Sequence, residues 1–123
     1  MSPKRPYLLK AFYDWLTENQ DVPFILVNAD EVNGFVPVSA VKEGTVVLNI
    51  APTAVENLDI GIESMSFQCR FNGVSTALKV PMRSIFSIYG KASGQGLEFD
   101  KEEYAEELLS KTFEKPDSKL RLV

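Results

Sequence analysis

Apolar residues near the start of the chain recur at the spacing of one helix face. The stripe consists of Leu8, Ala11, Phe12, Trp15 and Leu16. Pro6 suits the first turn of a helix, where the missing backbone N–H would have no partner within the helix. The pattern therefore predicts a helix over residues 6–19.

This predicted helix is apolar around an unusually wide part of its surface, because Tyr7, Leu9 and Tyr13 extend the stripe. A helix at the edge of a small domain rarely hides so broad a face against its own sheet. Two interpretations follow. Either the helix is deeply buried within its own domain, or Tyr7, Phe12 and Trp15 contact a second subunit, which is the interpretation we favour.

The following segments have the composition of strands. Residues 24–29 are apolar on both faces, as expected of a central strand, and residues 45–50 form another apolar strand. A short segment that contains a proline, residues 35–39, predicts an edge strand between them. Residues 51–57, rich in small side chains, predict a loop or a single helical turn.

The strongest local signal is Asn72-Gly73, a dipeptide typical of the type I′ hairpin turn. A two-residue turn at this point sets the register of the flanking strands. On the face expected to enter the core, it pairs Phe71 with Val74, Cys69 with Thr76, Phe67 with Leu78, and Met65 with Val80. On the outward face, it pairs Arg70 with Ser75, Gln68 with Ala77, and Ser66 with Lys79. Cys69 is therefore expected to be a small core residue rather than a reactive thiol.

Two more helices are predicted after the hairpin. Residues 82–89 are expected to form a short helix, with Gly90 as its left-handed cap. Asp100 and Glu103 fit a capping box for a last helix that ends near residue 111.

The predicted elements indicate one α+β domain. We expect this domain to cover residues 1–112, with the N-terminal helix beside a strongly bent antiparallel sheet or a small open barrel. Residues 113–123 are expected to form a flexible C-terminal tail.

Composition argues against most kinds of enzyme. The 123 residues include no histidine and one cysteine, which excludes imidazole catalysis and a zinc site made of cysteine and histidine. Candidate catalytic carboxylates are Asp30, Glu31, Glu102, Glu103 and Glu106. We expect them at a turn and on a solvated helix face, with no partner base. The sequence therefore predicts no catalytic residue, no metal site and no cofactor.

No targeting segment is predicted. The longest unbroken apolar run, residues 23–27, is far shorter than the roughly 20 residues that span a bilayer. Lys10 and Asp14 interrupt the apolar stretch that follows the basic N-terminus, unlike a signal peptide. We expect a cytoplasmic protein with a reduced cysteine.

Charge is unevenly distributed, although the formal net charge is only −4. No acidic residue occurs between Ser64 and Leu97. The bases in this acid-free stretch are Arg70, Lys79, Arg83 and Lys91. Either this is a chance feature of a solvated surface, or the stretch faces an acidic ligand. A pI of about 4.8 is unfavourable for a nucleic-acid surface.

Several motifs closely resemble the bacterial stringent starvation protein B (SspB) family. They are KRPYLLKAFYDWL at residues 4–16, VVLNIAP at 46–52, FQCRFNG at 67–73, VPM at 80–82 and IY at 88–89. The resemblance covers about residues 3–100, and the combination of motifs is more specific than any single one. The resemblance implies a homodimeric adaptor with an Sm-like, partly open barrel. It implies that the dimer forms through the N-terminal helix, by way of Tyr7, Ala11, Phe12 and Trp15.

SspB proteins capture the ssrA degradation tag, an extended peptide with acidic residues, and deliver the tagged polypeptide to the ClpXP protease. The resemblance places the tag in a groove formed by Asn49, Ile50, Ala51, Ala54, Val55, Gln68 and Arg70. Small residues allow a peptide backbone to come close, and an arginine can hold a carboxylate through two N–H groups.

The end of the chain also resembles the family. SspB proteins end in a hydrophobic-basic module that docks on ClpX, and Leu120, Arg121, Leu122 and Val123 are similar to it. The terminal lysine of that module is missing here, and the preceding linker is much shorter than is usual in the family.

Two other classes of function stay open. Small Sm-like barrels often bind RNA, so an RNA-binding regulator is the main alternative. The acidic pI and the shortage of exposed aromatic and basic pairs count against it. A plain interaction scaffold without a tag groove is the third.

Overall fold

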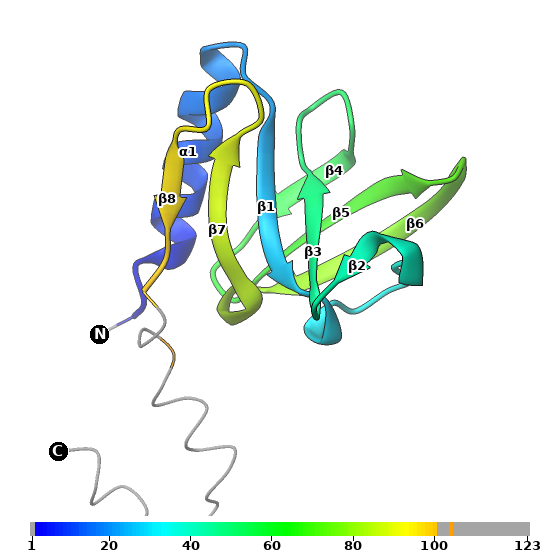
Figure 1. Ribbon diagram of the computed structural model, residues 1–123. Helices are drawn as coiled ribbons and strands as arrows, with labels where there is room; N and C mark the ends of the chain where they lie inside the picture. Colours follow the sequence, from blue (N-terminus) through cyan, green and yellow to red (C-terminus); the bar gives the residue numbers. More distant parts are fainter. Residues whose placement is uncertain (1, 101–103, 105–123) are drawn as a thin grey trace, which may run out of the picture.

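The computed structural model describes residues 2–100 and 104, in which one long helix stands beside two sheets (Figure 1). Helix α1 spans Arg5–Glu18. The strands are β1 Pro23–Asn28, β2 Val41–Lys42, β3 Thr45–Asn49, β4 Glu56–Ile60, β5 Ser64–Phe71, β6 Val74–Pro81, β7 Ile85–Gly90 and β8 Gly96–Glu98. Short 3-10 helices occur at η1 Ala29–Glu31, η2 Val38–Ala40 and η3 Met82–Ser84. The predicted α+β class, with an N-terminal helix and antiparallel strands, is confirmed.

The larger sheet has five antiparallel strands in the order β2-β3-β1-β7-β8. Strand β1 lies at its centre, where Ile25 pairs with Leu48 of β3 on one side and with Ile88 of β7 on the other. Helix α1 packs against β7 and β1 and buries Leu9 and Leu16. The predicted strands at 24–29 and 45–50 are confirmed to within one residue at each end.

The smaller sheet has three antiparallel strands in the order β4-β5-β6. Its β5–β6 hairpin has the register predicted from the turn dipeptide, with Phe67 opposite Leu78. Asn72 and Gly73 have φ angles of +52° and +82°, as a type I′ turn requires. A two-residue turn signal was thus sufficient to predict seven of the eight residue pairs of this hairpin, because hairpin register follows from turn length.

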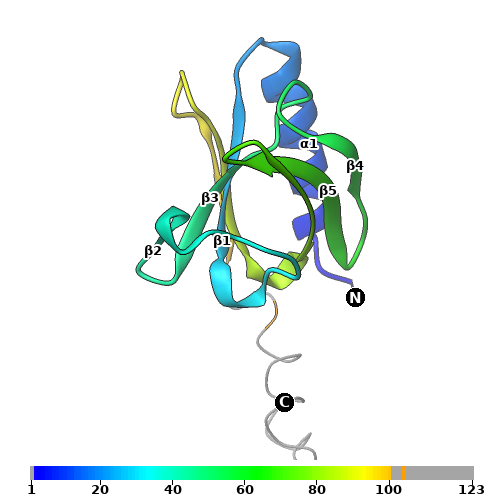
Figure 2. The same cartoon turned by 90° about the vertical axis from the view of Figure 1, so that its right-hand side faces the viewer.

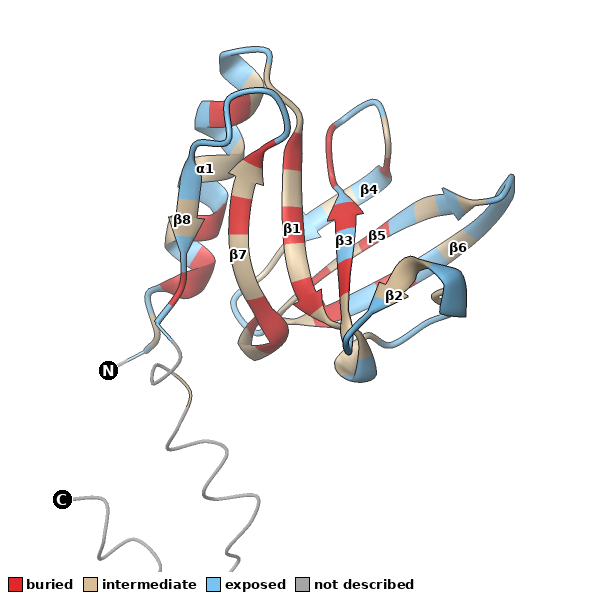
Figure 3. Cartoon of the chain, viewed as in Figure 1, coloured by how far each residue is buried: buried red, intermediate tan, exposed pale blue. Residues whose placement is uncertain are grey.

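Both sheets and α1 share one apolar core. Figure 2 shows the strands curving around a common centre. The largest fully buried apolar side chains are Leu9, Ile25, Val27, Val46, Ile50, Met65, Val80, Met82, Ile85 and Ile88. Buried positions follow β1, β3 and β7, whereas the outer ends of β5 and β6 are mostly exposed (Figure 3). The closer likeness to an Sm-like barrel stays a prediction.

The helix predicted over residues 82–89 is wrong. The 3-10 helix η3 occupies its start, and β7 occupies the rest and pairs with β1. Met82, Ile85 and Ile88 are all buried, at the three-residue spacing of a helix. The spacing has two causes. The 3-10 helix η3 separates Met82 from Ile85, and a register shift between β1 and β7 adds a residue between Ile85 and Ile88. Two interruptions of a strand therefore imitated helical periodicity.

The edge strand predicted over residues 35–39 is also wrong. Pro37 caps η2 with a φ of −61°, and it has no N–H to offer a neighbouring strand. The chain instead meets β6 two residues before Phe35. There the backbone N–H groups of Asn33 and Lys79 donate to each other's carbonyl oxygen atoms, both at 2.8 Å.

Strand β4 was missed because its alternation of apolar and polar residues is very short: only Leu58 and Ile60, on either side of Asp59, are apolar. It pairs only with β5, and its register is irregular between Glu56 and Asp59. Three alternating residues are too few to distinguish a strand from a loop by periodicity.

The buried face of α1 differs from the predicted stripe. Leu9 and Leu16 are buried, whereas Ala11 and Trp15, which the stripe included, are exposed. Phe12 is half-buried and packs against the core. The prediction differed because apolar residues at helical spacing give the same periodic signal whether they face the core or the solvent next to it.

Candidate functional site

A pocket of about 210 Å³ lies where the loop between β3 and β4 meets the β5–β6 hairpin. It is lined by Pro52, Thr53, Ala54, Val55, Glu56, Gln68, Cys69, Arg70 and Ser75. Four residues of the predicted groove are in this set: Ala54, Val55, Gln68 and Arg70. The tertiary structure therefore brings together two segments, around residues 54 and 69, that the sequence separates.

The other three predicted groove residues support the loop instead of lining the pocket. Ile50 is fully buried, and Ala51 is 6% exposed. The side-chain oxygen of Asn49 accepts a hydrogen bond from the Ala51 N–H at 2.9 Å, so this acceptor is already in use. The Ala51 carbonyl oxygen in turn accepts from the N–H groups of Ala54 at 2.8 Å and Val55 at 3.2 Å. The predicted single helical turn in this loop is thereby confirmed.

The pocket carries both signs of charge. The Arg70 side chain is exposed and donates one hydrogen bond from Nη1 to the carbonyl oxygen of Gly73 at 3.3 Å. Because a guanidinium has five N–H donors, the others are available to a ligand. Glu56 also lines this pocket, which the charge pattern along the chain did not predict.

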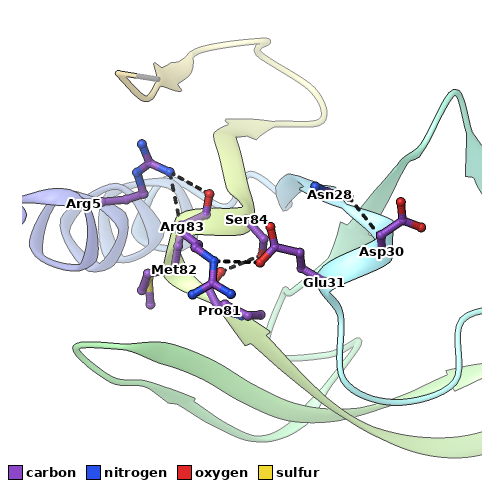
Figure 4. Close-up of polar contacts among 8 residues, drawn as sticks. All are labelled: Arg5, Asn28, Asp30, Glu31, Pro81, Met82, Arg83 and Ser84. Atoms are coloured by element: carbon purple, nitrogen blue, oxygen red, sulfur yellow. Dashed lines mark hydrogen bonds and ion pairs between the residues drawn. The ribbon is translucent and has the colours of Figure 1, made fainter. Parts of the chain in front are cut away.

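The bases of the acid-free stretch do not gather at the pocket. Arg83 forms an ion pair with Glu31, with 2.8 Å between Nε and Oε1 (Figure 4). Lys91 lies over the ring of Phe24, 5.9 Å from its centroid. Within residues 2–100 and 104, Arg70 is the one basic residue that lines the pocket.

Cys69 lines one side of the pocket and is only half-buried, less than its predicted core position suggests. Burial raises the pKa of its thiol above the ordinary value. A raised pKa keeps the thiol protonated near neutral pH, which disfavours nucleophilic chemistry.

The candidate dimer surface lies on the exposed side of α1. Tyr7 is 58% and Trp15 is 46% exposed, and Trp15 packs edge-on against Phe12 at 5.7 Å between ring centroids. Between α1 and the β4–β5 turn lies a hollow of about 360 Å³. Its lining residues are Pro6, Tyr7, Lys10, Ala11, Asp14, Ile60, Gly61 and Ile62.

The candidate catalytic carboxylates do not form a metal site in the described part of the chain. No group of three or more His, Cys, Asp or Glu side chains there could hold a metal ion. Glu31 is paired with Arg83, and Asn28 caps η1 by accepting the N–H of Asp30 (Figure 4). The candidate carboxylates Glu102, Glu103 and Glu106 lie outside the described residues. So do the predicted last helix and the tail residues Leu120, Arg121, Leu122 and Val123. Among the described residues, none of the helices has the length and apolar character needed to cross a membrane.

Arg5 is an organising residue that the sequence pattern did not reveal. It is 3% exposed, and its guanidinium donates to the carbonyl oxygen atoms of Met82 and Arg83 (Figure 4) and to those of Ile85 and Asp100. The guanidinium carbon also lies 5.1 Å from the ring centroid of Phe99 and 4.8 Å from that of Tyr104. An arginine at the start of a helix gives no periodic signal that would distinguish this buried role.

The described part of the chain is thus a small α+β domain with an open pocket of mixed polarity beside its second sheet. The family model for stringent starvation protein B matches residues 3–120. A Haemophilus influenzae protein, "Stringent starvation protein B homolog", is 44% identical over 107 residues, which is 87% of this chain and 71% of that protein. The chain therefore belongs to the stringent starvation protein B family, a family of non-catalytic adaptors.

Proposed function

We propose that this chain is an adaptor that holds an acidic, extended degradation tag of the ssrA type in the pocket beside β5. In this proposal, it delivers the tagged polypeptide to the ClpXP protease in the cytoplasm. The main supporting observation is that Ala54, Val55, Gln68 and Arg70 line one pocket. A small side chain at Ala54 lets a peptide backbone come close, and the free N–H groups of Arg70 can receive a carboxylate.

The test is fluorescence anisotropy with a labelled ssrA-tag peptide and a second peptide in which the acidic residues are replaced by their amides. We expect saturable binding of the first peptide and weaker binding of the second. Arg70→Gln should weaken binding of the acidic peptide by about 1–3 kcal/mol, the range for losing a hydrogen bond to a charged group. Ala54→Trp should also weaken it, because the indole fills part of the pocket.

Lys79→Gln is the matched control, because it removes one positive charge from the same outward face of the hairpin without changing the pocket lining. Its affinity should stay within about twofold of the wild type. If both pocket variants bind the acidic peptide like the control, the tag does not bind in this pocket. An RNA oligonucleotide whose binding falls steeply with salt would instead favour the RNA-binding alternative.

We further propose that the adaptor is a homodimer formed through Tyr7, Ala11, Phe12 and Trp15. Exposed aromatic residues on one helix face support this proposal. Tyr7→Asp should yield a monomer by light scattering, whereas Val38→Asp, at an apolar residue that is 88% exposed elsewhere, should not. A dimer that persists in Tyr7→Asp and Trp15→Glu proteins would remove this face from the interface.

The proposed contact with ClpX rests on Leu120, Arg121, Leu122 and Val123. Deleting residues 120–123 should leave tag-peptide affinity unchanged and abolish the adaptor's enhancement of ClpXP degradation. Undiminished degradation with the truncated protein would show that these residues do not dock on ClpX.

A further inference from the structure

The side-chain amide of Gln68 can turn either its NH2 group or its carbonyl oxygen toward the pocket. Gln68 lies on the exposed face of β5 and lines the pocket beside Arg70. Its NH2 group donates hydrogen bonds, and its carbonyl oxygen accepts them. The end that faces a ligand therefore decides whether this position favours an acceptor or a donor.

Asn57 engages one of these ends. It lies in the irregular part of β4, between Glu56 and Asp59, and has a φ angle of +56°. Asparagine is one of the few residues that adopt this left-handed conformation readily. From this position, its Nδ2 donates to Oε1 of Gln68 at 3.3 Å. The Gln68 oxygen therefore points toward Asn57, which leaves the NH2 group on the other side of the amide for the pocket.

We infer that Asn57 is a positioning residue that makes the pocket selective for hydrogen-bond acceptors in the bound peptide. This inference rests on the proposed function. Asn57 holds Gln68 with its NH2 group available, so Gln68 and Arg70 together present donors to a carboxylate or a main-chain carbonyl. Glu56 lines the same pocket and lies directly opposite Gln68 in the β4–β5 pairing, so it disfavours a carboxylate on its own side of Gln68 and favours one on the side of Arg70. The acidic group of the peptide is therefore directed toward Gln68 and Arg70.

Two substitutions separate this role from a general effect on the fold. Asn57→Gly keeps the left-handed backbone accessible and removes the side-chain donor. Asn57→Asp keeps the shape of the side chain but can only accept a hydrogen bond near neutral pH. A carboxylate at this position therefore draws the Gln68 NH2 group toward itself and turns the Gln68 carbonyl oxygen to the pocket.

The measurement is the ratio of dissociation constants for the acidic peptide and its amide counterpart. Asn57→Gly should reduce the wild-type preference for the acidic peptide about threefold, and Asn57→Asp about tenfold, as expected for losing or inverting one hydrogen bond. Both substitutions are repeated in a Gln68→Ala background to form double-mutant cycles. There, Asn57→Gly should have no effect on the ratio, and Asn57→Asp should retain only its charge effect, about twofold.

An unchanged preference in the Asn57→Gly protein would overturn the inference, as would equal effects of Asn57→Asp with and without Gln68. In both cases the proposed function stands, because the wild type still prefers the acidic peptide. If the wild type binds neither peptide, the proposed function fails and this inference fails with it. Thermal unfolding of each variant confirms that the proteins compared are folded.

Discussion

The two ends of the β5–β6 hairpin share one regular register but differ in environment. At the end near η3, Phe67 and Leu78 are 3% and 2% exposed, whereas Val74, beside the turn, is 62% exposed. The inner end belongs to the core, whereas the outer end packs against it only through half-buried side chains such as Phe71 and forms one wall of the candidate pocket. This difference shows how burial at one end of a strand pair can position the side chains of a candidate pocket at the other end.

The largest effect should come from matched truncations along one strand. Phe67→Ala removes a ring from the core and should destabilise the protein by about 3–5 kcal/mol, because it leaves a cavity. Phe71→Ala, at a half-buried position on the same face of β5, should cost less than about 1.5 kcal/mol. Urea unfolding of both variants measures the difference. Equal losses would show that the outer end is as firmly packed as the inner end.

The next effect concerns how the inner end is anchored to α1. Arg5→Met should destabilise the protein by about 2–4 kcal/mol, because carbonyl groups of η3 and its surroundings lose a buried donor. Lys10→Met, at an exposed position in the same helix, should change stability by less than about 0.5 kcal/mol. Urea unfolding is again the measurement, and similar values for the two variants would argue against an anchoring role for Arg5.

Substitutions at two glycines, one beside β6 and one in the hairpin turn, should show a smaller difference in stability. Gly34 has a φ of +130°, and a Cβ added there would lie 2.5 Å from the carbonyl oxygen of Ala77 in β6. Gly34→Ala should therefore cost about 2–3 kcal/mol through crowding and strain. Gly73, in the turn, has a φ of +82° and open space around it, so Gly73→Ala should cost only about 1 kcal/mol. A larger loss at Gly73 in thermal unfolding would reverse the comparison.

The smallest effect is expected at another exposed turn, between β7 and β8, where Asp21 accepts hydrogen bonds from Ala92 and Ser93. The pKa of Asp21 is lowered from 3.8 to about 2. The largest cause is the hydroxyl of Ser93, and the backbone N–H groups of Ala92, Val22 and Ser93 add to it. Because the pKa of Asp21 is lower in the folded than in the unfolded state, its ionised carboxylate stabilises the fold above about pH 4. This stabilisation is lost as the pH falls through about 2. Here a carboxylate, rather than apolar packing, holds the turn.

Asp21→Asn should lower the unfolding temperature at pH 5, and its difference from the wild type should shrink toward pH 2. Ser93→Ala should produce part of the same change, since the Ser93 hydroxyl makes the largest contribution. A difference between wild type and Asp21→Asn that is independent of pH would show that the ionised carboxylate is not responsible.

Local signals predicted some elements well and failed at others for identifiable reasons. The Asn72-Gly73 turn determines its own hairpin, because both residues readily adopt a positive φ and the loop length leaves one register. Residues 82–89 failed because a 3-10 helix and a register shift made buried positions recur every three residues. Such interruptions depend on the neighbouring strand β1, which lies about 60 residues away in the sequence.

The candidate pocket was partly predictable. The hairpin register placed Gln68 and Arg70 on the outward face, and the family resemblance added Ala54 and Val55. Glu56 and Asn57 were not recognised, because the short alternation in β4 begins only at Leu58 and the irregular register before it arises on pairing with β5. Ile50 was predicted to line the groove but is fully buried. It follows the last residue of β3, and whether its side chain faces the core or the pocket depends on where the second sheet lies.

By itself, the sequence determined the helix near the N-terminus, the central strands, the hairpin with its register, and the family to which the chain belongs. These features depend on neighbouring residues or on motifs that stand together in the chain. Only the tertiary structure decided that Arg5 is buried, that Arg83 is paired with Glu31, and that Glu56 joins Arg70 in one pocket. The physical reason is that burial and charge pairing depend on which distant segments pack together, and the local pattern of apolar and polar residues does not encode that choice.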